Sequence, residues 1–87
     1  MKLKVVDYEL QLFRINNELV RKPTQRLYVA DEPGYVTLSH CYIGYHEDGK
    51  EYEVEGRDIN LTGRATYELA HILLDFVGRN KKEENRE

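Results

Sequence analysis

The sequence predicts an α+β fold, a four-stranded antiparallel β-meander followed by one C-terminal α-helix packed on one face of the sheet (ββββα). Two observations predict it. Three turn signals separate four segments of strand-like hydrophobicity, and the final segment places apolar residues at helical spacing. Eighty-seven residues suit one domain. We expect that domain over residues 1–78, followed by a charged, disordered tail over residues 79–87.

Turn-forming residues divide the first part of the chain into four expected strands. The turns are Asn16-Asn17, Asp31-Glu32-Pro33-Gly34 and Glu47-Asp48-Gly49-Lys50. The strands are expected at residues 3–15, 18–30, 35–46 and 50–57. Pro23 denies its strand a hydrogen-bond donor and predicts a kink, a bulge or an edge position. Gly44 indicates a bend or a close approach of another group to the backbone.

The third strand departs from simple alternation of apolar and polar residues. Leu38 and Tyr42 lie on one face, whereas Cys41 and Ile43 lie on the other. Two interpretations remain open. Either a bulge near residues 39–40 switches the faces, or both faces are buried in the middle of the sheet.

The helix expected over residues 61–77 carries more apolar surface than one contact with a sheet requires. Asn60 or Thr62 can cap its start, and Gly78 stands where a helix often ends. An inward stripe is formed by Ala65, Leu69, Ile72, Leu73 and Phe76. A further apolar flank is formed by Tyr67, Ala70, Leu74 and Val77. We expect either this flank or the far face of the sheet to make a dimer contact, and the other to bind a partner.

Composition restricts the class of protein. Cys41 is the only cysteine, which excludes an internal disulfide. Without a signal-like N-terminus, a single cysteine favours a cytoplasmic location. No apolar run approaches the roughly 18 residues that a membrane span needs, so we expect no membrane association. Because a chain this short buries a modest share of its surface, we expect a homodimer.

Charge is unevenly distributed along the sequence. The net charge is −3, but residues 1–30 carry +3 and residues 31–60 carry −6. Such asymmetry can orient a partner or a second subunit. The simpler interpretation is that these charges keep exposed strand faces soluble.

Histidine and cysteine in the third strand raise the question of a metal site. His40 and Cys41 are adjacent and point to opposite faces, and His46 lies roughly 20 Å along the strand from His40. Zinc ligands must lie within about 2 Å of one ion. We therefore expect no metal and no cofactor. Because no base is positioned beside Cys41, we expect no catalytic residue and no enzyme activity.

Tyrosine content points to binding. Seven tyrosines and no tryptophan occur in the chain, and tyrosine is enriched in protein interfaces, although it also favours half-buried strand positions. The expected partner-binding residues are Tyr67, Ala70, Leu74, Val77, Tyr28 and Tyr45.

The function we expect is that of a small non-catalytic protein acting through a protein–protein interface. Small acidic domains of this kind include phage and mobile-element inhibitors of host defence proteins. One alternative is a homo-oligomer that sequesters a nucleotide or other small anion, with Arg14, Arg21 and Arg26 on phosphates and Tyr28 stacking on the base. A weak single-stranded nucleic-acid binder would use the same residues, but the negative net charge disfavours it.

Overall fold

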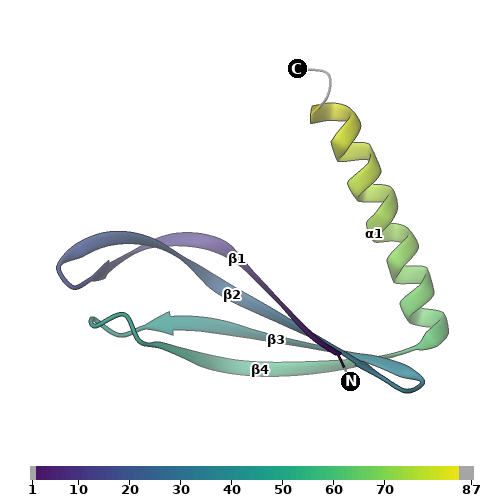
Figure 1. Ribbon diagram of the computed structural model, residues 1–87, viewed down its shortest axis with the longest axis horizontal. Coiled ribbons are helices and arrows are strands. Elements are labelled where there is room, and N and C mark those ends of the chain that lie inside the picture. The colour runs from purple at the N-terminus through teal and green to yellow at the C-terminus, as the bar shows by residue number, and fades with distance from the viewer. Residues whose placement is uncertain (1, 85–87) are drawn as a thin grey trace.

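The computed structural model describes the backbone of residues 2–84 and the side chains of residues 3–80. The elements are β1 (Lys2–Ile15), β2 (Glu18–Glu32), β3 (Tyr35–Tyr45), β4 (Glu51–Thr62) and α1 (Gly63–Glu84). The four strands form one antiparallel sheet in the order β1-β2-β3-β4 (Figure 1). The predicted ββββα order and the α+β class are confirmed.

The fourth strand is longer than expected. Its last residues pair with the first half of β3, so β4 ends at Thr62 rather than near residue 57. Side chains support this pairing: the Thr37 hydroxyl donates to Asn60 Oδ1 at 2.7 Å, and the Ser39 hydroxyl donates to Asp58 at 2.6 Å. Asn60 is therefore a strand residue, and its expected role as a helix cap is wrong.

A bulge interrupts the β3–β4 pairing, but it lies in β4. The register shifts between His40 and Tyr42, which pair with Arg57 and Val54, so β4 holds one residue more than β3 across this gap. Glu55 takes a positive φ of 55° there. The residues of β3 therefore keep their alternation. The two apolar faces of this strand lie on opposite sides of the sheet, in two different environments.

The distal half of the β1–β2 hairpin bends away from β3 and folds over one face of the sheet. Pairing of β2 with β3 stops at Gln25, so the first six residues of β2, Glu18 to Pro23, pair with β1 alone. Pro23, which lacks an N–H, lies in this edge segment, as the sequence indicated. The Tyr45 hydroxyl donates to the Pro23 carbonyl at 2.7 Å, and the Asn16 N–H donates to the Glu47 carbonyl at 2.8 Å.

The small core lies beneath this bend. Among the described residues, the buried apolar side chains are Ile15, Cys41 and Ile43. Phe13 meets Tyr45 edge-on beside them, with ring centroids 4.9 Å apart. The second apolar face of β3 thus contacts the bent hairpin.

The helix does not pack across the sheet. Figure 1 shows α1 leaving the end of the sheet at which β2 turns into β3 and standing at an open angle to the strands. Ile72, Leu73 and Phe76, expected to face the sheet, are 54–65% exposed. The expected packing is therefore absent from the single chain, because Gly63 begins the helix directly after the last strand residue.

The end of α1 also differs from the expectation. Gly78 lies inside the helix, and the helix continues to Glu84. The Lys and Glu residues that follow Gly78 favour helix, which offsets the roughly 1 kcal/mol cost of one internal glycine. Residues 85–87 of the expected tail lie outside the described residues.

Candidate functional site

The face of the sheet opposite the core is uncovered and exposes many apolar side chains, with the charged Lys4 and Arg57 lying among them. Side chains of directly paired residues share a face, and the register places Val6, Leu27 and His40 together on this side. We call it the open face. Its exposed apolar side chains, 42–61% accessible, are Val6, Leu10, Leu12, Tyr42, Tyr52, Val54 and Ile59.

Aromatic rings make the middle of the open face rigid. His40 Nε2 lies 2.9 Å from Gln25 Oε1. The Tyr42 ring stands edge-on to His40 at 5.0 Å, and the Tyr8 ring lies 6.3 Å away on the other side. These contacts hold large apolar groups in place although half of the Tyr42 surface is exposed. The open face therefore offers a preformed apolar surface to a partner.

A close approach to the backbone occurs on the same face, at Gly44. The Tyr52 ring lies so near Gly44 that an added Cβ would overlap its distal atoms. Tyr52 also contacts the His46 ring at 4.8 Å. The sequence indicated a bend or a close approach at Gly44, and the structure shows the close approach.

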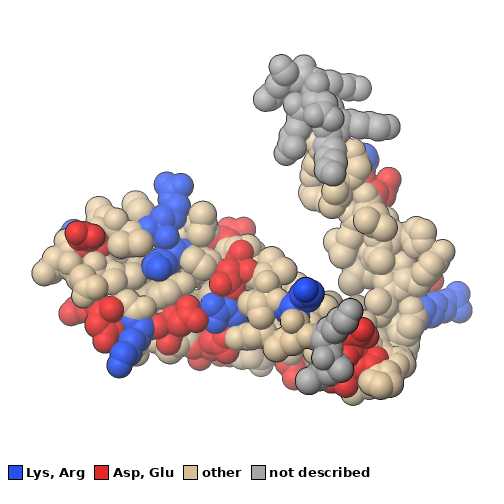
Figure 2. Space-filling model, viewed as in Figure 1, with Lys and Arg blue, Asp and Glu red and all other residues tan. Residues whose placement is uncertain are grey.

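The helix presents two apolar surfaces. We call the large apolar residues of the expected inward stripe the inner stripe; they are Leu69, Ile72, Leu73 and Phe76. The flank consists of Tyr67, Ala70, Leu74 and Val77. Leu74 and Tyr67 are 68% and 67% exposed. In Figure 2 the middle of the visible side of α1 is uncharged and charged side chains lie along its edge, whereas the sheet carries both acidic and basic side chains across its surface. Contiguous exposed apolar surface of this kind marks interaction sites in soluble proteins.

The other face of the sheet is organised around Arg26. Its Nε and Nη2 bond both oxygens of Asp7, at 2.7 and 3.1 Å, and its Nη1 bonds Glu51 and Glu53, at 3.0 and 2.9 Å. Tyr28 donates to Glu53 as well. The basic first third of the chain thus meets the acidic middle third within a single sheet. With its side chain 12% exposed and all three nitrogens engaged, Arg26 is committed to the fold.

These contacts shift the pKa values of the groups involved. The Arg26 hydrogen bonds hold the pKa of Asp7 below its usual value. The hydrogen bond from Tyr28, and then that from Arg26, lowers the pKa of Glu53, while Glu53 raises the pKa of Tyr28. The lowered values favour the ionised carboxylates that Arg26 binds, and the raised value keeps the Tyr28 hydroxyl protonated as a donor to Glu53.

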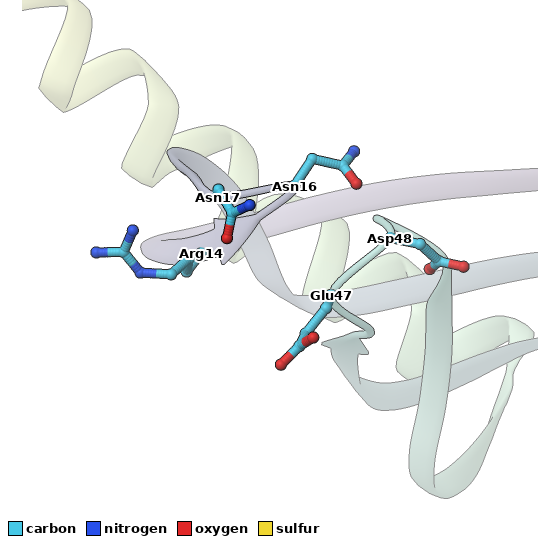
Figure 3. Close-up of a pocket in the computed structure, with 5 residues that line it drawn as sticks. All are labelled: Arg14, Asn16, Asn17, Glu47 and Asp48. Carbon is cyan, nitrogen blue, oxygen red and sulfur yellow. The ribbon is translucent and has the colours of Figure 1, made fainter.

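The arginines expected to bind phosphate do not meet. Arg14 and Arg21 are exposed on the distal β1–β2 hairpin, while Arg26 lies on the opposite face with its three carboxylates. A hollow of about 350 Å³ lies beside Arg14, lined also by Asn16, Asn17, Glu47 and Asp48. In Figure 3 the Arg14 guanidinium and the Asp48 carboxylate point in opposite directions, so the lining does not converge on one centre.

The residues expected to bind a partner divide into two groups. Tyr67, Ala70, Leu74 and Val77 lie together on α1 and are exposed. Tyr28 and Tyr45 are half-buried on the core side of the sheet, where their hydroxyls donate to Glu53 and to the Pro23 carbonyl. The helix members form a continuous surface, and the two strand tyrosines do not belong to it.

Comparison of the chain with known protein families, with curated proteins and with solved structures found no match. Within the described residues, no helix combines the length and apolar character that crossing a membrane requires. Over the same residues, no three His, Cys, Asp or Glu side chains come together in a way that could hold a metal ion.

Sequence reasoning missed the open face as a candidate site. Val6, Leu10 and Leu12 alternate with polar residues, a pattern that predicts one apolar face covered by the rest of the chain and one exposed to water. Alternation identifies an apolar face but not what covers it. One signal could have shown that the helix does not cover this face: no linker residues separate the last strand from the helix. The expectation that the strand ends near residue 57 hid this signal, because it left several residues for a linker.

Proposed function

We propose that this protein is a small non-catalytic binding module that acts by contact with another protein. The observation that carries the proposal is the exposed flank of α1. Leu74 is 68% exposed and Val77 is 48% exposed, on a helix whose inner stripe is also exposed at Ile72, Leu73 and Phe76. Covering apolar surface contributes a favourable free energy of about 25 cal/mol per Å², before the entropic and other costs of association are subtracted.

The chemistry of the flank suits a protein partner. Tyr67 and His71 rings lie edge-on at 4.3 Å, which gives the flank a rigid aromatic anchor at one end. Leu74 and Val77 continue it toward the C-terminal end of α1. Aromatic anchors beside aliphatic side chains are typical of the residues that dominate binding energy in protein interfaces.

Affinity capture from the native host with two matched variants tests the proposal. Leu74→Asp puts a charge in the centre of the flank, and Arg64→Asp puts the same residue on the polar side, where the Arg64 side chain is 90% exposed. We expect a specific protein to be retained by the wild type and by Arg64→Asp, and lost with Leu74→Asp. Equal capture by all three proteins would contradict the proposal.

Salt dependence of the captured complex provides a second readout. Binding through apolar surface should change little as salt is raised, whereas binding to nucleic acid falls steeply. A complex that survives nuclease treatment and high salt supports the proposal. One that is lost under both conditions contradicts it.

A further inference from the structure

The single chain exposes far more surface than a compact protein of its size. Its accessible surface is 7384 Å² and its mass is 10.3 kDa, whereas a compact monomer of that mass exposes about 5,400 Å². Its radius of gyration is 16.7 Å, against about 12 Å for a compact chain of this length. The excess of about 2,000 Å² matches one subunit's share of a large obligate dimer interface.

Two apolar surfaces that the chain does not bring together contribute to this excess. Large aliphatic and aromatic side chains are exposed on both the open face and the inner stripe of α1. The inner stripe from Leu69 to Phe76 covers about 11 Å of the helix axis, so it fits within the roughly 36 Å length of a strand of 11 residues. The opposite face also exposes Leu3 and Val5. It presents Arg26, Asp58 and other bonded polar groups beside them, so it suits the stripe less well.

The connection between sheet and helix prevents α1 from reaching its own open face. No residue lies between Thr62, the last residue of β4, and Gly63, the first of α1. Connections that fold a helix back onto its sheet usually take about 2–6 residues. The Thr66 hydroxyl further ties the first turn of the helix to the Thr62 carbonyl at 2.9 Å. Short connections of this kind favour exchange of the element between two copies.

We propose that two copies of this chain exchange their helices, so that the inner stripe of each α1 packs on the open face of the other. One two-fold arrangement then covers both surfaces in both copies. The flank of α1 remains uncovered, so the exchange is independent of the target that the flank binds. It places the dimer contact on Ile72 and Phe76 instead of on Leu74.

Lengthening the connection tests the exchange. About five Gly and Ser residues inserted between Thr62 and Gly63 give α1 the loop it needs to fold back on its own sheet. We expect the wild type to sediment as two copies and the insertion variant as one folded copy. A wild type that sediments as one copy would overturn the proposal, and so would an insertion variant that stays wholly dimeric.

A pair of aspartate variants separates this contact from the flank. Ile72→Asp should shift the dimer to a single copy at concentrations where the wild type is dimeric, because it charges the inner stripe. Arg64→Asp, on the polar side of α1 where the Arg64 side chain is 90% exposed, should leave the dimer intact. Dimerisation that survives Ile72→Asp would overturn the proposal while leaving the proposed function untouched.

Mixed isotope labelling shows directly whose helix covers the face. In a dimer formed from labelled and unlabelled chains, isotope-filtered nuclear Overhauser effects between the Phe76 ring and the Ile59 methyl groups report contacts between copies. We expect these effects in the mixed sample. Their presence within one chain and absence between chains would overturn the exchange.

Discussion

Arg26 holds Asp7 through two parallel hydrogen bonds, from Nε at 2.7 Å and from Nη2 at 3.1 Å, across the β1–β2 pair. The same guanidinium reaches across β3 to Glu51 and Glu53 on β4. One side chain therefore connects three of the four strands on the face that the bent hairpin partly covers. This network stabilises a sheet whose buried apolar core is small.

Replacing Arg26 with alanine should weaken the fold. The variant loses several charge-assisted hydrogen bonds and leaves three carboxylates close together, although those carboxylates are 35–47% exposed and partly screened. We expect a loss of about 1–2 kcal/mol in the free energy of unfolding, measured by urea titration near neutral pH. A loss below about 0.5 kcal/mol, the range of ordinary surface substitutions, would contradict the assigned role.

Stability should fall in acid because of the same network. The pKa values of Asp7 and Glu53 are lowered in the folded protein. Their contribution is therefore present above the unfolded values of about 4 and is lost as pH falls through the folded pKa values. We expect the melting temperature to drop between about pH 5 and pH 2, and to drop less in Arg26→Ala. Parallel curves for the two proteins would show that Arg26 does not set the acid response.

Cys41 should be unreactive in the folded protein. Cys41 is 5% exposed, and burial raises the pKa of its thiol, so little thiolate is present near neutral pH. We expect a thiol reagent to modify the native protein at least tenfold more slowly than the protein in urea. Comparable rates in the two states would indicate that the bent hairpin does not cover Cys41.

Ile15 should be among the most sensitive positions to truncation. It is 7% exposed beneath the bend, and its Cγ2 lies close to Gly49 in the β3–β4 turn. Ile15→Ala should cost about 2–5 kcal/mol, as buried aliphatic residues do. Leu19→Ala, at a nearby side chain that is 62% exposed, should cost less than about 0.5 kcal/mol. Both are measured at one protein concentration, because dimerisation contributes to stability. Equal costs would contradict the location of the core.

Local signals were enough to predict the strand order but not the end of the last strand. Asn16, Gly34 and Gly49 adopt the positive φ angles that their turns require, so the hairpins followed from residue type alone. Residues 58–60 lie beyond the expected end of the strand. Asp58 and Asn60 pair with Ser39 and Thr37 on β3, which provide polar partners, and no local pattern reports that pairing.

The helix shows where sequence reasoning ends for the candidate site. Periodicity identified both the inner stripe and the flank, and the structure places Leu74 and Tyr67 on one exposed surface as expected. Periodicity does not specify which surface covers an apolar stripe, because that depends on how far the connecting segment can reach. The extension of β4 to Thr62 removes that reach.

Sedimentation equilibrium of the wild-type chain tests the central claim most directly. If the open face and the inner stripe are covered by a second copy, the measured mass should be twice 10.3 kDa and should approach the single-chain value only on strong dilution. A mass of 10.3 kDa at every concentration up to the solubility limit would contradict it.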